Sequence, residues 1–410
     1  MNLNWLLSSS VRHAGRLHKH VWRILSAQRD LLPPGSVSAV ESALREMQAT
    51  CAATRDPKRL EAQMAHLEAV ANKWLKPYPH ATLRENIEVL LVVLAVFLGI
   101  RTFIAQPFKI PTGSMQPTLY GVTSHPDWQA RPSKDLRPNP DFEIPNRLAR
   151  FFSYWISGIA YDHVVCAAEG SIETQTDEPT RFLMFNLWQT FVVGGSSYKV
   201  WFPPERMLQR AGLVYPGNQV NPRVFKAGED IIKMRSYAGD HLFVERITYN
   251  FRRPRRGEII VFETKDIPEM SPRDLGQFYI KRLVALGGET VRIGDDRHLY
   301  INGQRLTKET PHFEKVYSFD PAQPPAESHY SGHVNGLIFQ YAAGHFNDER
   351  TEYPVPPGHY MVMGDNTLNS SDSRVWGSFP EENVIGRSCF VFWPFGWQEG
   401  RSSRWGWGTR

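Results

Sequence analysis

Cysteine is scarce in this chain of 410 residues, which contains only Cys51, Cys166 and Cys389. Three cysteines are too few for a disulfide framework, and they lack the paired spacing of a zinc site. We expect isolated buried thiols. The alternative is one disulfide between Cys166 and Cys389, which requires both to lie outside the cytoplasm, and the sequence leaves that alternative open.

The chain also has little excess charge, with 47 Lys and Arg against 42 Asp and Glu and a net charge of +5. It contains no helix-turn-helix pattern and no basic stripe interleaved with aromatics, so we expect no nucleic-acid partner. The composition, 41% hydrophobic and 22% charged, is typical of a globular protein that buries a core. The length predicts more than one domain.

Long apolar runs are limited to one strongly apolar stretch, residues 89–100. Extended to 87–105, it approaches the roughly 20 residues that cross a membrane, with Glu88 and Arg101 near its ends, where their side chains can reach the interface. We predict one transmembrane helix over 84–105; the alternative is a buried helix of a soluble protein. Twelve Lys and Arg against six Asp and Glu up to Arg84 predict a cytoplasmic N-terminus.

Residues 1–83 are expected to form a separate cytoplasmic helical region. Apolar residues recur at helical spacing over 37–47 and 58–74, with Leu60, Met64, Leu67, Ala71 and Trp74 on one face. The first seven residues are too short for a secretory signal. We expect a helical hairpin packed on itself; the alternative is a docking element for a partner or a membrane surface.

The segment after the apolar run reads FKIPTGSMQPTL over 108–119. Pro111 and Pro117 disfavour a helix, and Gly113 allows the chain to turn sharply before Ser114. Taken alone, this pattern is also typical of an ordinary turn.

A second segment, YIKRLVALGG over 279–288, is predicted to be a strand. Alternation places Tyr279, Lys281 and Leu283 on one face. A lysine on an apolar face can lose its charge, because burial disfavours the ammonium form. The alternative is a lysine whose charged end reaches water.

Together with three more stretches, these segments resemble the type I signal peptidases, also called bacterial leader peptidases. The stretches are 238–246 (AGDHLFVER), 256–262 (RGEIIVF, with Glu258 where Asp is usual) and 363–377 (MGDNTLNSSDSRVWG). The resemblance covers the apolar run, about 106–120 and 228–394, but not 1–83 or most of 121–227.

The resemblance implies a mainly β catalytic domain of the signal-peptidase and LexA-like fold over 106–410. It implies a serine endopeptidase anchored in the cell membrane, with its catalytic domain on the outer side. Such an enzyme removes signal peptides from translocated preproteins after Ala-x-Ala-like sites and works beside the lipid bilayer and the secretion translocon. No metal or other cofactor is expected.

The family's site residues carry over by position. Cleavage by a serine needs a base, and a lysine serves if its pKa falls by roughly three units from ~10.4. The resemblance assigns the following: Ser114 as nucleophile, Lys281 as general base and acid, the Ser114 amide and Thr112 as the oxyanion hole, Ser370, Asp372, Arg374 and Arg282 as supporting residues, and Phe108, Ile110, Pro111 and Ile280 as substrate contacts.

Two insertions interrupt the pattern, at about 121–227 and 305–355. The first is rich in aromatics, with a loop expected over 131–145 and strands over 164–201. We expect a β-rich subdomain with its own small core; the alternative is that its aromatics lie at the lipid headgroups. The second insertion is expected to form a lobe away from the chemistry. Short strands are expected over 231–234, 242–248, 258–263, 279–286, 290–293 and 298–301, with a hairpin turn at Asn302-Gly303.

Two competing functions follow from the same residues. A self-cleaving regulator of the LexA type predicts a DNA-binding domain and no membrane span, and neither fits this sequence. A non-catalytic, membrane-tethered β scaffold predicts decayed motifs, whereas both Ser114 and Lys281 are present.

Overall fold

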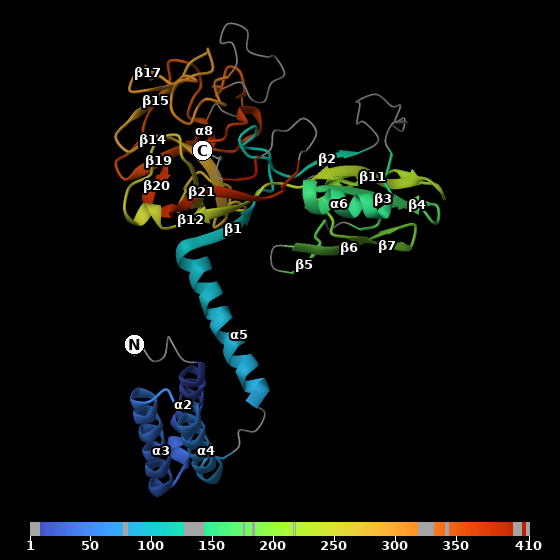
Figure 1. Ribbon diagram of the computed structural model, residues 1–410. Coiled ribbons are helices and arrows are strands. Elements are labelled where there is room, and N and C mark those ends of the chain that lie inside the picture. The colour runs from blue at the N-terminus through green and yellow to red at the C-terminus, as the bar shows by residue number, and fades with distance from the viewer. Residues whose placement is uncertain are drawn as a thin grey trace. The chain divides into compact units, whose positions relative to one another are not determined.

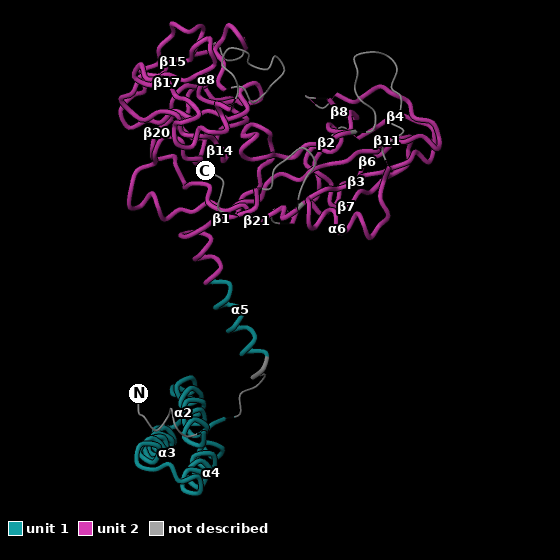
Figure 2. Tube along the Cα trace, turned by 45° about the horizontal axis from the view of Figure 1, so that its top comes forward, with its two compact units in different colours: residues 1–95 teal, residues 96–410 magenta. Residues whose placement is uncertain are grey.

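The computed structural model divides the chain into two compact units, residues 1–95 and 96–410 (Figure 2). It describes residues 9–76, 81–126, 143–174, 177–182, 185–215, 217, 219–318, 332–340, 344–396 and 404–406. Most of the loop expected over 131–145 lies outside these residues.

The first unit contains a bundle of three helices: α2 (Ser9–Gln28), α3 (Pro34–Ala53) and α4 (Pro57–Trp74), with a short 3-10 helix η1 (Arg29–Leu31) after α2. Buried Val21, Leu44 and Leu67, one from each helix, belong to its apolar core. The expected hairpin was therefore incomplete, because α2 was not predicted. Trp74 was also placed wrongly, since it is exposed at the end of α4.

The apolar run forms helix α5 (Ala81–Gly99), which continues into a π-helix, η2 (Ile100–Ile104). The most apolar 18-residue window within Leu83–Ile104 has a mean hydropathy of 2.4 and is 0% buried. Its length and composition allow it to cross a membrane. The alternative of a soluble core helix is not supported, because that helix would be buried.

A seven-stranded antiparallel sheet forms the centre of the second unit (Figure 1). In spatial order its strands are β1 (Ala105–Lys109), β12 (His241–Glu245), β21 (Val384–Trp393), β13 (Ile259–Glu263), β14 (Phe278–Leu286), β19 (His359–Met363) and β20 (Phe379–Pro380). Alternation along β13 sends Ile259 and Val261 into one apolar cluster and Ile260 and Phe262 into another. The sheet is therefore covered on both faces, and β1 is an edge strand.

Short elements complete the region around this sheet. They are the 3-10 helices η3 (Thr248–Asn250), η5 (Thr367–Asn369) and η6 (Glu381–Asn383), and the short helix α8 (Ser373–Trp376).

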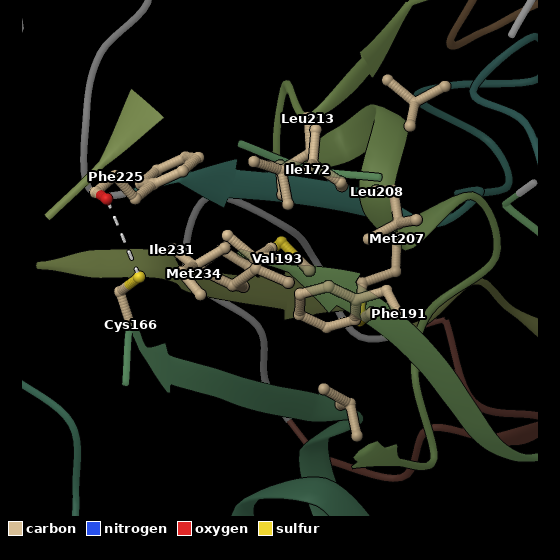
Figure 3. Close-up of a cluster of buried hydrophobic side chains, with 14 residues drawn as sticks. Cys166, Ile172, Phe191, Val193, Met207, Leu208, Leu213, Phe225, Ile231 and Met234 are labelled. Atoms are coloured by element: carbon tan, nitrogen blue, oxygen red, sulfur yellow. Dashed lines mark hydrogen bonds between the residues drawn. The ribbon is translucent and has the colours of Figure 1, made fainter. Parts of the chain in front are cut away.

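The first insertion has its own core, as expected, in which Phe191 and Phe225 are buried (Figure 3). Ile231 and Met234 belong to the same core, because their strand β11 pairs with β2 and β3 and not with the central sheet. The insertion therefore extends beyond residue 227. Helix α6 was not predicted from the sequence. The elements are β2 (Thr123–Pro126), α6 (Arg147–Ser157), β3 (Ile159–Val165), β4 (Gly170–Ser171), β5 (Thr180–Phe182), β6 (Phe185–Val193), β7 (Ser196–Trp201), α7 (Met207–Arg210), β8 (Val214–Tyr215), β9 (Gln219–Val220), β10 (Val224–Phe225) and β11 (Asp230–Tyr237).

A four-stranded sheet joins β15 (Thr290–Ile293) and β16 (Leu299–Ile301), which precede the second insertion, to β17 (Gln304–Arg305) and β18 (Glu352–Pro354) at its two ends. The turn at Asn302-Gly303 joins β16 to β17, as expected, with both residues at positive φ. Phe313 and Phe346 pack with Val284 of β14 in one cluster, so this lobe lies against the central sheet.

All three cysteines are unpaired. The thiol of Cys166 donates to the carbonyl of Ala168, and that of Cys389 to the carbonyl of Phe243. The thiols are isolated, as expected, but only Cys166 is buried, whereas Cys51 and Cys389 are half-buried.

Candidate active site

Ser114 lies on the loop that follows β1, and its side chain is 5% exposed. A second loop, which follows β19, holds it in place. The backbone N–H of Asn366 donates to the Ser114 carbonyl at 3.0 Å, and the Asn366 side-chain amide donates to the Gly113 carbonyl at 2.8 Å. These bonds fix the backbone on both sides of the Ser114 hydroxyl.

Gly364 allows the two loops to approach this closely. A Cβ atom at this position would lie 2.5 Å from the carbonyl oxygen of Ser114 and would also overlap the hydroxyl of Ser370. The sequence Gly-Asp-Asn therefore begins with glycine for a steric reason.

The Asp240 backbone and carboxylate hold the ends of the Ser114 loop. Its carbonyl accepts from the Ile110 N–H at 2.9 Å, and its carboxylate accepts from the Tyr120 N–H at 2.8 Å. The carboxylate is buried and also accepts from Arg404, with distances of 2.7–3.0 Å. Sequence analysis singled out the Gly239-Asp240 pair as a motif, but it did not identify Arg404.

Lys281 reaches this loop from β14, and its Nζ lies 2.7 Å from the Ser114 Oγ. The side chain is 5% exposed. Tyr279 and Leu283, which alternation placed on the same face, pack in one apolar cluster. The alternative of a lysine whose charged end reaches water is therefore wrong.

Burial lowers the pKa of Lys281 to about 8 from an ordinary value of 10.5. Desolvation is the main cause, because an ammonium group loses its hydration inside the protein. The Asp372 carboxylate opposes this effect and the Arg374 guanidinium adds to it. The amine can thus lose its proton close to neutral pH.

Arg282, the next residue along β14, forms a buried ion pair with Asp365. The two bonds run from Nε to Oδ1 at 2.7 Å and from Nη2 to Oδ2 at 2.6 Å. Thr118 donates to the same carboxylate at 2.5 Å, so the pair joins the loop after Ser114 to the loop after β19. Sequence analysis named Arg282 but did not identify Asp365 as its partner.

Asp372 and Arg374 form a second buried ion pair, with bonds of 2.8 and 2.9 Å. The Asp372 carboxylate also accepts from the Gly364 N–H at 2.9 Å. Burial alone would raise the pKa of Asp372, but Arg374 and these hydrogen bonds keep it below its ordinary value. The carboxylate therefore stays ionised beside Lys281.

Two candidate residues are less tightly engaged. Ser370 is buried and influences the pKa of Asp372, but its hydroxyl meets the geometry of a hydrogen bond with none of the described residues. Thr112 is exposed, two residues before Ser114.

The candidate substrate contacts lie around the free edge of β1. Ile110 is buried, whereas Phe108 and Ile280 are half-buried against the same apolar cluster. Phe108 also packs edge-to-face on Phe278 of β14, with ring centroids 5.6 Å apart. Pro111 is exposed. An extended chain beside β1 would therefore meet apolar surface close to Ser114.

Among the described residues, no three His, Cys, Asp or Glu side chains come together as a metal site.

Comparison with known proteins finds similarity to signal peptidases. Residues 233–393 match the family described as signal peptidase, peptidase S26. The probable signal peptidase I-1 of Synechocystis is 36% identical over 41% of this chain and 66% of its own length. The signal peptidase I of Pseudomonas aeruginosa is 28% identical over 56% of this chain and 83% of its own.

The chain is therefore similar to signal peptidases over residues 233–393. A solved signal peptidase I from Enterococcus faecalis is 30% identical, with 33% of this chain and 97% of that chain covered and a TM-score of 0.22. Matches with several curated signal peptidases span between 56% and 66% of their length. The S26 match includes Lys281 and the ion pairs of Arg282 with Asp365 and of Asp372 with Arg374, while Ser114 lies outside it.

Proposed function

We propose that this chain is a membrane-anchored serine endopeptidase that removes signal peptides from translocated preproteins. The observation that carries the proposal is the buried 2.7 Å contact between Lys281 Nζ and Ser114 Oγ, in a chain whose residues 233–393 match the signal peptidase family. A hydroxyl next to an amine of lowered pKa is the arrangement that a Ser-Lys dyad needs.

In this mechanism the neutral Lys281 amine takes the Ser114 proton as Oγ attacks the carbonyl carbon of the scissile peptide bond. The tetrahedral intermediate collapses, the C–N bond breaks, and the Lys281 ammonium gives its proton to the leaving amine. Lys281 then removes a proton from the water that hydrolyses the Ser114 ester.

The developing oxyanion needs two hydrogen-bond donors. We assign these to the backbone N–H of Ser114 and the hydroxyl of Thr112, whose exposure leaves it free to turn towards a bound substrate. The ion pair of Asp372 and Arg374 and the hydroxyl of Ser370 support Lys281 from the other side.

The substrate is proposed to bind as an added strand along the free edge of β1. Phe108 and Pro111 would flank it, and Ile110 and Ile280 would line the pockets for residues before the cut. Close apolar walls favour small side chains there, hence Ala-x-Ala-like sites.

The enzyme is proposed to lie in the cell membrane with residues 1–83 in the cytoplasm, the span over 84–105 and the catalytic domain over 106–410 outside. Ser114 follows the end of the apolar helix at Ile104 by ten residues. A preprotein leaving the secretion translocon would therefore meet Ser114 near the outer membrane surface.

The test is cleavage of a preprotein by the purified full chain. Ser114→Ala and Lys281→Ala should each abolish cleavage, whereas Ser197→Ala and Lys265→Ala, at an exposed serine and an exposed lysine, should keep it. Undiminished cleavage by either dyad variant rejects the mechanism.

Membrane orientation is tested separately. In sealed cells, external protease should leave residues 1–83 intact while digesting residues beyond the span. Digestion of residues 1–83 in cells that remain sealed would reject the proposed orientation.

A further inference from the structure

Helix α6 in the first insertion carries its apolar residues on the outside. Leu148, Phe151, Phe152, Trp155 and Ile156 follow the spacing of a single helix face and are 50–74% exposed. A surface helix of a globular protein normally turns such a face towards the core. In α6 no residue is buried.

The helix is well defined despite this orientation. The Asn146 side chain caps its first turn by accepting from the Ala149 N–H at 2.9 Å, and Gly158 ends it at a φ of 65°. Arg150, on the inner side, donates to the Tyr161 carbonyl of β3 at 2.9 Å. The polar side of α6 therefore binds the protein and its apolar face points away.

Residues at and after the end of β21 in the central sheet bind the C-terminal end of α6. The Trp393 indole N–H donates to the Trp155 carbonyl at 2.8 Å, and the N–H groups of Phe395 and Gly396 donate to the Ile156 carbonyl. Trp393 ends β21, which pairs with β12, and β12 pairs with β1 directly after the apolar helix. Hydrogen-bonded strands thus connect α6 to the end of the candidate membrane span.

In Figure 2 α6 lies at the lower edge of residues 96–410, the side from which the apolar helix leaves this unit, whereas in Figure 1 strands β5, β6 and β7 lie lower than α6 on that side. Phe103 at the end of that helix is also strongly exposed, as is Phe251 after η3. Asn250, the neighbour of Phe251 in the sequence, lines one pocket together with Phe103.

We infer that α6 is an interfacial helix, which lies in the headgroup region of the bilayer with its apolar face towards the acyl chains. Its composition fits anionic lipid, because Arg147 in its first turn is exposed and the helix contains no acidic residue. Phenylalanine, leucine and tryptophan are the residues that such helices bury at this depth. The inference rests on the proposed membrane anchor and not on catalysis.

This contact would fix the first insertion against the membrane and limit rotation of the catalytic domain about the apolar helix. The β1 edge would then keep a constant height above the bilayer. The two alternatives for the first insertion, a core of its own or aromatics at the lipid headgroups, therefore apply to different parts of it. Phe191 fills the core, while Phe151, Phe152 and Trp155 meet lipid.

Tryptophan quenching tests the inference in the full chain, because residues Leu83–Ile104 contain no tryptophan. The protein is reconstituted in vesicles of phosphatidylcholine and phosphatidylglycerol whose acyl chains carry bromine near the headgroup. Trp155→Phe should lose a clear share of the lipid-dependent quenching. Trp22→Phe is the matched control, since Trp22 is 54% and Trp155 53% exposed. A loss no larger than that of the control overturns the inference, whether α6 faces water or a second copy covers it.

A second variant keeps Trp155 and changes its neighbours. Phe151→Ser with Phe152→Ser should reduce the Trp155 quenching, whereas Leu337→Ser, at another exposed apolar position, should not. Unchanged quenching in the double variant would contradict membrane insertion of α6. Alkaline extraction distinguishes loss of the α6 contact from loss of the membrane anchor. A chain that alkali releases from the vesicles lacks the membrane span and not only the α6 contact.

Discussion

The rate of cleavage should depend on pH through the proton on Lys281. With a pKa of about 8, about one tenth of the enzyme carries a neutral amine at pH 7. A lysine at the ordinary value of 10.5 would be neutral in about one molecule in three thousand. Burial at this site therefore raises the concentration of active base about 300-fold at neutral pH.

The assay is kcat/KM for preprotein cleavage by the detergent-solubilised enzyme from about pH 6 to about pH 10. Because the base must be deprotonated, kcat/KM should rise about tenfold per pH unit on the acidic side and level off above about pH 8. A profile that keeps rising to the pKa of an exposed lysine, or one that does not change with pH, would refute this reasoning. Circular dichroism across the same range controls for unfolding.

Three substitutions test the surrounding structure. Lys281→Met should abolish cleavage yet stabilise the fold by up to about 3 kcal/mol below pH 8, because the depressed pKa means that protonation of the buried amine opposes folding. Thermal unfolding should show that this gain in stability disappears as the pH rises from about 8 to 10.5. A gain that stays constant with pH would exclude this cause. Arg282→Met should destabilise the protein by about 3–5 kcal/mol, since it leaves Asp365 as an unpaired buried charge. Denaturant unfolding should show that adding Asp365→Leu recovers most of this lost stability. No recovery would argue against the ion pair as the cause. Gly364→Ala should lower kcat more than it raises KM, because the new methyl group displaces Ser114; unchanged steady-state kinetics would mean that the loops adjust freely.

Local patterns in the sequence identified much of the secondary structure. Alternation over 279–286 predicted β14, and helical spacing over 37–47 and 58–74 predicted parts of α3 and α4. Helices α2 and α6 were missed for different reasons. In α2 the buried Val11, Val21 and Leu25 are separated by histidines and arginines, while α6 follows a proline-rich stretch and turns its apolar face outward.

Pairing between distant segments was harder to predict. Arg282 and Asp365 are 83 positions apart, and Asp240 and Arg404 are 164 apart. Strand periodicity gives the face on which a side chain lies but not the loop that covers it. The sequence resemblance suggested that Ser114 and Lys281 meet, whereas the pairing of Asp365 with Arg282 became visible only from the packing of the two loops.

The most direct test of the account is an NMR titration of isotope-labelled lysine side chains in the full-length protein, with Lys281→Met used to assign the resonance. The account predicts that the Lys281 side chain titrates near pH 8 and that its signal shows a buried amine next to the Ser114 hydroxyl. A midpoint near 10.5, the value of an exposed lysine, would contradict the claim that this residue serves as the base.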